Sequence, residues 1–155
     1  MVVEGVRTKL LLFAGITALA ALPWIHPFGP VRKQQPTALP IDDPGALAAI
    51  QKACQNCHSQ RTQWPLYSYL PVVSWALERD VAEARRHLDL SGWDRYSTEE
   101  KRDLLARIGS EVRNGRMPLP RYLLLHPEAR LSDAETRRIY EWTQVQRHAL
   151  RSQRE

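Results

Sequence analysis

The chain has 155 residues and a formal net charge of +5, because 22 lysine and arginine residues outnumber 17 aspartate and glutamate residues. This length suffices for one modest domain and excludes a multidomain architecture. No basic run is interleaved with aromatic side chains, so nucleic-acid binding is not expected, whereas a mildly basic face for an acidic partner or an anionic membrane remains open.

The first 25 residues (1–25) are typical of an export segment. Residues 10–22 carry no charge and follow Arg7 and Lys9, which is the order of a basic n-region and an apolar h-region. The A-L-A sequence at 18–20 resembles a cleavage site, and cleavage would leave a soluble periplasmic protein. Against cleavage, the apolar stretch reaches Ile25 and Trp24 suits an interfacial anchor. A helix over 10–25 would span about 24 Å of a roughly 30 Å hydrocarbon core, so an anchor requires some bilayer thinning. We expect a membrane anchor rather than a cleaved signal. The positive-inside rule then places the rest of the chain outside the cytoplasm, on the periplasmic side.

Residues 26–41 are expected to form an extended tether. Four of the chain's eleven prolines lie there, without apolar periodicity. The sequence therefore predicts one folded domain over residues 42–150 and a polar tail at 151–155.

The first helix of the domain leads directly into the most informative motif of the chain. Asp43 is a predicted N-cap followed by proline, and Leu47, Ile50 and Cys54 recur at helical spacing. Residues 54–58 then read C-Q-N-C-H, which is the C-x-x-C-H attachment sequence of a c-type haem. The two thiols can add to the two vinyl groups of one porphyrin, and the adjoining histidine can donate a ring nitrogen to the iron.

Cys54, Cys57 and His58 are therefore candidate haem-binding residues, and other uses of the motif fit less well. A zinc site usually needs four ligands, and an iron–sulfur cluster four thiolates, whereas the chain has two cysteines and scattered histidines. A thioredoxin-like redox pair should follow a strand of a βαβ unit. A disulfide between the two cysteines would leave His58 without a role.

The segment after the motif, residues 61–70, is irregular and aromatic. Trp64 and Tyr67 follow His58 closely along the chain, so we expect them to contact the porphyrin. Three arginines, Arg61, Arg113 and Arg116, are candidates for pairing with haem propionates, the alternative being simple surface exposure.

Three further helices are predicted. The second opens at Pro71 and ends at Ser91-Gly92. The third begins at a capping box, in which Glu100 stands three residues after Ser97, and it ends near Asn114-Gly115. A second capping box, formed by Ser132 and Glu135, begins the terminal helix. Their inward-facing residues are expected to be Val73, Leu77, Val81 and Leu88, then Leu104, Leu105, Ile108 and Val112, and finally Ile139, Trp142 and Val145. No segment alternates with a period of two, so the domain is expected to be all-α, with about four to five helices around one haem.

Met117 is the candidate ligand for the far side of the iron. It is the one methionine beyond the initiator, and it lies between glycine and proline in a predicted loop. Methionine and histidine are the usual axial partners of a c-type haem histidine. His126, in the same loop, is the histidine alternative, whereas His87 is expected on the surface; an open sixth site is the third possibility.

These motifs together resemble the small bacterial haem-binding domain proteins and, more generally, class I c-type cytochromes. The resemblance covers most of the chain, up to about Trp142. It is carried by C-x-x-C-H-S at 54–59, T-x-W-P-x-Y at 62–67, P-V-V-S-W at 71–75, D-V at 80–81, L-S-G-W at 90–93 and G-x-M-P at 115–118. It implies a membrane-anchored, cytochrome-c-like domain with one haem c, held covalently by Cys54 and Cys57, with His58 as proximal and Met117 as distal ligand.

We therefore expect an electron carrier rather than an enzyme. Its partners would be periplasmic or membrane redox proteins, with the inner membrane contacted through the N-terminal segment. The alternative is a haem enzyme or gas sensor with an open or labile sixth site, in which His126 or an arginine would have to act as the distal acid–base group.

Overall fold

The computed structural model describes residues 2–21, 31, 33 and 41–152, and of residues 2–4 the backbone alone. Every regular element in these ranges is a helix, which confirms the predicted all-α class. Helix α1 (Val2–Ala21) covers much of the predicted export segment. None of the described helices combines the length and the apolar character needed to cross a membrane. Residues 22–25 of the predicted anchor, and most of the tether, lie outside the described ranges.

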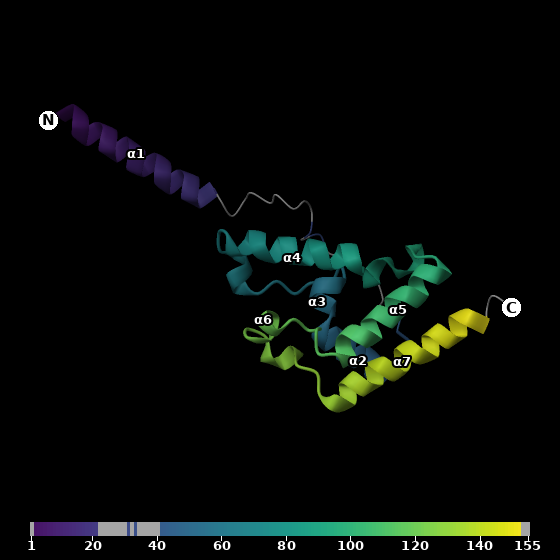
Figure 1. Cartoon of the computed structure of the whole chain (residues 1–155). Helices are drawn as coiled ribbons and strands as arrows, with labels where there is room; N and C mark the ends of the chain where they lie inside the picture. Colours follow the sequence, from purple (N-terminus) through teal and green to yellow (C-terminus); the bar gives the residue numbers. More distant parts are fainter. Residues whose placement is uncertain (1, 22–30, 32, 34–40, 153–155) are drawn as a thin grey trace.

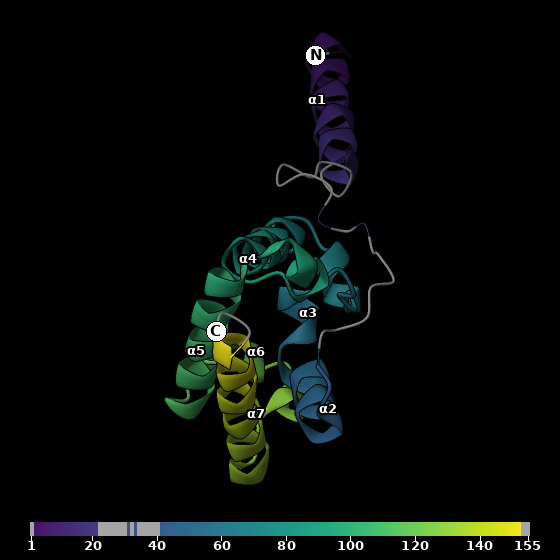
Figure 2. The ribbon, with the colours of Figure 1, turned by 90° about the vertical axis from the view of Figure 1, so that its right-hand side faces the viewer.

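The domain is built from six α-helices and three short 3₁₀ helices within the described residues. They are α2 (Pro44–Ala53), α3 (Gln55–His58), η2 (Leu66–Tyr69), α4 (Val73–His87), η3 (Leu90–Arg95), α5 (Thr98–Arg113), α6 (Pro120–Leu123), η4 (Pro127–Ala129) and α7 (Asp133–Ser152). Helices α5 and α7 lie side by side and run in opposite directions, α2 packs on α7, and α3 packs on α4 (Figures 1 and 2). The short α3 thus lies between α2 and α4 (Figure 2).

Side-chain caps fix the starts of three helices at the predicted positions. Asp43 accepts a hydrogen bond of 2.7 Å from the backbone N–H of Ala46, at the start of α2. At the start of α5, the Ser97 hydroxyl accepts from the Glu100 N–H, and the Glu100 carboxylate accepts from the Ser97 N–H at 2.8 Å. The same reciprocal pair joins Ser132 and Glu135 before α7. All three predicted caps are confirmed.

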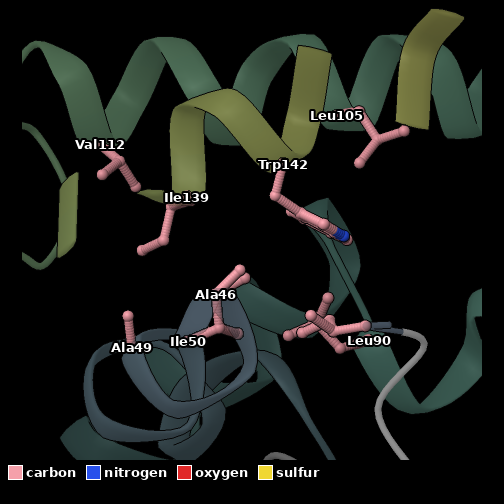
Figure 3. Packing of buried hydrophobic residues seen from close by; sticks show 9 residues of the cluster. Ala46, Ala49, Ile50, Leu90, Leu105, Val112, Ile139 and Trp142 are labelled. Carbon is pink, nitrogen blue, oxygen red and sulfur yellow. The ribbon is translucent and has the colours of Figure 1, made fainter. Parts of the chain in front are cut away.

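The hydrophobic core lies where α2, α5 and α7 meet (Figure 3). Ile50, Leu105 and Ile139 are almost completely buried, and Trp142 packs among them while its indole N–H donates to Asp42 at 3.0 Å. The buried face of α7 continues from Trp142 to Thr143. Because α7 turns that face toward α5 and α2, the predicted inward position of Val145 is wrong, and this side chain is 63% exposed.

The close contact between α5 and α7 depends on Gly109. A Cβ atom at this position would lie 2.7 Å from the hydroxyl oxygen of Thr143, closer than side-chain packing allows. The absence of a side chain at this point of α5 therefore lets the two helices approach each other closely.

Replacing Ile139 with alanine is expected to destabilise the domain by about 2–5 kcal/mol, because it leaves a cavity in a fully packed core. Ile139 has no exposed surface. Val145→Ala, on the same helix, is the matched control and is expected to change the free energy of unfolding by less than about 0.5 kcal/mol. Denaturant unfolding followed by circular dichroism measures both, and equal losses for the two variants would contradict this placement of the core.

Two predicted segments differ from the structure. Helix α4 ends at His87, and the stretch expected to close it forms the separate 3₁₀ helix η3 instead. Val73, predicted to face inward, begins α4 and is 37% exposed. The predicted loop between α5 and α7 contains α6 and η4, each opened by a proline, which supplies the backbone φ of a first helical turn.

Candidate functional site

The C-x-x-C-H residues lie at a sharp junction between two helices. Cys54 ends α2 with a non-helical backbone (φ −122°, ψ −31°), and α3 begins at the next residue. The N–H groups of Cys57 and His58 both reach back to the carbonyl of Cys54, at 3.2 and 3.0 Å. This single turn presents both thiols and the imidazole to the same space.

That space is a cavity of about 570 Å³. Its wall includes all six predicted cofactor-binding residues, namely Cys54, Cys57, His58, Trp64, Tyr67 and Met117. Aliphatic side chains from α2, α4, α5 and the connecting loops complete it, among them Ile50, Val81, Leu88, Leu90, Leu104 and Ile108. The volume lies within the roughly 300–1,000 Å³ of typical cofactor pockets.

The His58 ring is held by the backbone at the end of α4. Its Nδ1 lies 3.1 Å from the carbonyl oxygen of Leu88. An Nδ1–H that donates to this carbonyl fixes the tautomer whose lone pair is on Nε2, as second-shell partners do for metal-binding histidines. Burial also lowers the pKa of His58, more than the nearby backbone carbonyls raise it, and this favours the neutral imidazole that a metal requires.

The two thiols are free cysteines in this structure. Burial, reinforced by the nearby Cys57, raises the pKa of Cys54 to about 12. Burial also raises the pKa of Cys57. Both groups therefore remain protonated near neutral pH, whereas a cysteine binds a free metal cation as its thiolate. The described residues contain no group of three or more His, Cys, Asp or Glu side chains able to hold a metal ion.

Met117 reaches the cavity from a turn that follows α5. Gly115 adopts a positive φ of 66°, which an L side chain rarely tolerates, and so turns the chain away from the helix axis. The Met117 N–H then donates to the carbonyl of Glu111 at 3.2 Å. Arg116 fastens the turn by a two-point ion pair with the Glu111 carboxylate, at 2.8 and 2.7 Å. The Met117 side chain is half-buried and lies on the cavity wall.

His126, the alternative histidine ligand, also lies on the cavity wall but has partners on both ring nitrogens. Nε2 is 2.5 Å from the hydroxyl of Tyr67, and Nδ1 is 2.9 Å from the Glu128 carboxylate. His87 is 68% exposed and pairs with Glu83, as expected of a surface histidine, although it borders the same cavity.

The arginines proposed from sequence for propionate contacts do not line this cavity. Arg116 forms an ion pair with Glu111. The Arg113 guanidinium lies over the ring of Tyr140, 5.0 Å from its centroid. Two other arginines, Arg107 on α5 and Arg121 on α6, are on the wall instead. The sequence did not indicate either residue, because Arg107 lies on the outer side of a predicted helix and Arg121 lies in a predicted loop.

Two further residues that sequence reasoning missed hold the motif in place. Asn56, in a variable position of C-x-x-C-H, accepts from the Thr62 hydroxyl at 2.6 Å and the Gln63 N–H at 3.0 Å, and donates to the Tyr122 hydroxyl at 3.1 Å. Arg85 donates to the carbonyls of Ser59 (3.0 Å) and Val31 (2.8 Å), joining the motif to the tether. Polar residues within a helix or a motif give no periodic signal, so neither role is readable from sequence.

The donor set fits a haem. Two protonated thiols and one oriented imidazole lie at one part of the wall, and a thioether arrives from a separate loop, around a space lined by aliphatic and aromatic side chains. This combination supplies both covalent attachment points and both axial ligand types of a c-type haem.

A family model described as Haem-binding domain matches residues 20–145 of the chain. The comparison with curated proteins gives no match, and neither does the comparison with solved structures. The matched range contains the whole cavity wall, from Ile50 to His126.

Proposed function

Because this chain belongs to the haem-binding domain family, we propose that it is a single-haem c-type cytochrome that transfers electrons outside the cytoplasm. The observation that carries this proposal is the meeting of Cys54, Cys57, His58 and Met117 on one cavity. When bound, the haem supplies an iron that changes its oxidation state by one electron.

Each residue of the site has a definite part in this proposal. Cys54 and Cys57 would hold the porphyrin through thioether bonds, and His58 Nε2 would bind the iron while the Leu88 carbonyl orients the His58 ring. Met117 would supply the second iron ligand, and thioether ligation raises the reduction potential relative to a second histidine. Trp64 and Tyr67, which line the cavity, would pack against the porphyrin.

Solvent exclusion is the main contribution of the aliphatic wall, because a dry site limits the solvent reorganisation that accompanies a change of charge. Arg107 and Arg121 are the residues we assign to the haem propionates. Arg121 already lies 3.2 Å from Asp80, which balances part of its charge on the cavity rim.

The location and the partners are part of the proposal. The basic N-terminus and the apolar sequence of α1 support export. Haem attached outside the cytoplasm would exchange electrons with periplasmic or membrane redox proteins. We propose that the protein acts as an electron carrier without a reaction of its own.

The experiment that tests this function is a redox titration of the exported, purified protein. We expect haem that survives denaturing electrophoresis, one reversible electron per chain, a low-spin spectrum in both oxidation states, and no rapid binding of carbon monoxide. A high-spin haem that binds carbon monoxide or peroxide readily would instead favour the haem enzyme or sensor, for which His126 on the cavity wall would be the distal group.

A further inference from the structure

Two neighbouring tips of the domain expose large apolar side chains, and haem binding does not account for their exposure. The first tip comprises residues 66–73, and the second comprises residues 124–125, which follow α6. We call them the apolar tips. Their side chains that are more than half exposed are Leu66, Tyr69, Leu70, Val72, Leu124 and Leu125. A cluster of exposed apolar side chains on a folded domain marks a contact with a membrane or with another protein.

The two tips lie on the same side of the domain. The hydroxyl of Tyr67, within the first tip, is 2.5 Å from Nε2 of His126, which directly follows the second tip. Arg121 of α6 also pairs with Asp80 of α4 at 3.2 Å. Accordingly, the start of α4 and helix α6 lie at the same end of the domain, on the left in Figure 1. One surface can therefore contact both tips.

Val72 holds a backbone conformation that valine rarely adopts. Its φ is 68° and its ψ is −47°, and the Val73 N–H donates to the Pro71 carbonyl at 2.8 Å. This is a γ-turn with positive φ, which is rare and strained, above all at a β-branched residue. The Val72 side chain is 63% exposed, so packing within the domain offsets little of the strain. A surface outside the domain would supply the burial that this side chain lacks.

The composition and the exposure of the tips favour a lipid surface over a folded protein. Residues 62–77 and 122–125 carry no charged side chain, so their insertion at a membrane surface would remove no charge from water. Leu66 is 90% exposed and Leu124 is 81% exposed, as side chains on projecting points are. Lipids close around a projecting side chain, whereas a protein partner would need a matching pocket. Tyr69 adds an aromatic ring with a hydroxyl, a side chain that favours the membrane–water interface.

The length of chain before the domain keeps the tips close to any membrane that holds α1. Arg85 of α4 donates to the carbonyl of Val31 at 2.8 Å, and Val31 is buried, so this residue of the tether is fixed to the domain. From Ala21, the end of α1, the ten residue steps to Val31 reach at most about 35 Å. Along α4, Arg85 lies about 18 Å from Val73 in the first tip. These lengths allow α1 and the apolar tips to contact the same bilayer.

We propose that the apolar tips insert into the surface of the lipid bilayer that holds α1, as a second membrane contact of the chain. Helix α1 exposes large apolar side chains of its own, such as Leu11 and Phe13, which the same bilayer would cover. This inference deepens the proposed function, because it selects membrane-bound proteins among the redox partners. Tyr67 and Leu125 belong to the cavity wall as well as to the tips, so the contact turns the haem cavity toward the membrane.

The test uses the full-length protein in vesicles of phosphatidylethanolamine and phosphatidylglycerol that contain a phospholipid with a photoactivatable acyl chain. After illumination, trypsin cleaves after Lys and Arg, and mass spectrometry measures the lipid adducts on each peptide. The tips fall in peptides 62–79 and 122–130. Peptide 139–147 of α7 is the internal control, because its Val145 is 63% exposed, as Val72 is. We expect the two tip peptides to carry about ten times the adducts of the control peptide.

Two variants separate insertion from folding. Leu66→Asp places a charge at the most exposed position of the tips and should lower the adducts on peptide 62–79 by about tenfold, because insertion would take the charge out of water. Val72→Gly removes an exposed side chain at a positive φ that suits glycine. It should lower the adducts on the same peptide without lowering the thermal unfolding midpoint. Val145→Asp is the matched control and should leave the adducts on both tip peptides unchanged.

Equal adduct yields on the tip peptides and on peptide 139–147 would overturn the lipid contact, as would tip yields that Leu66→Asp leaves unchanged. In that event a dimer in detergent solution would assign the tips to a second copy of the chain, and a monomer would assign them to a partner protein. Haem staining of the same samples tests the cytochrome separately. Stained protein without tip adducts contradicts the lipid contact alone, and unstained protein with tip adducts contradicts the cytochrome alone.

Discussion

Replacing both Cys54 and Cys57 with serine is expected to abolish haem staining of the denatured protein completely. A serine hydroxyl does not form the thioether bond that keeps haem attached after unfolding. Both thiols line the same cavity, so both can reach one bound porphyrin. Each single variant is expected to retain stain through the remaining thiol, because the two attachment points are independent bonds. Haem staining after denaturing electrophoresis measures all three variants.

Gln55→Ser is the matched control for this experiment. It introduces serine into the same helix, α3, between the two cysteines and leaves both thiols in place. We expect its haem stain to equal that of the wild type at equal protein load. Stain that persists in the double variant would contradict covalent attachment, and loss of stain in Gln55→Ser would show that disturbance of α3, rather than loss of the thiols, causes the effect.

The sequence predicted those parts of the fold in which a local interaction decides the outcome. Asp43, Ser97 and Ser132 each cap a helix through contacts within three residues, and such contacts can be read from residue types and spacing. The failures lie where tertiary packing decides. Val145 matched a helical pattern, but α7 rotates its buried face toward Trp142 and Thr143.

The sequence predicted the residues that carry the chemistry of the candidate site, but it did not predict the residues that hold them in place. Cys54, Cys57, His58 and Met117 have few chemical alternatives in such a motif, and all four line the cavity. The contacts of Arg85 with Ser59 and of Tyr67 with His126 join residues 26 and 59 positions apart. Each of these partners is an ordinary polar residue in its own segment. Such contacts form only when α4, η2 and the α6–η4 segment pack together. The sequence of one segment alone therefore does not indicate them.

Replacing Met117 with alanine is expected to convert a closed, low-spin haem into one with an open sixth position. The turn fixed by Gly115 and by the Arg116–Glu111 ion pair brings the thioether to the cavity wall, and a methyl group at this position has no ligand atom. The oxidised variant should lose the weak near-infrared band that reports a bond between methionine sulfur and iron(III). The reduced variant should bind carbon monoxide, and the reduction potential should fall.

Two further variants decide between Met117 and the other candidates for the sixth position. Leu119→Ala removes a side chain of about the same size as methionine from the same cavity wall without touching sulfur, so it should keep the near-infrared band. His126→Gln should keep it as well, because both nitrogens of that ring already have partners in Tyr67 and Glu128. A low-spin spectrum that survives Met117→Ala but not His126→Gln would assign the ligand to the histidine. It would also require the Tyr67–His126 hydrogen bond to break when haem binds.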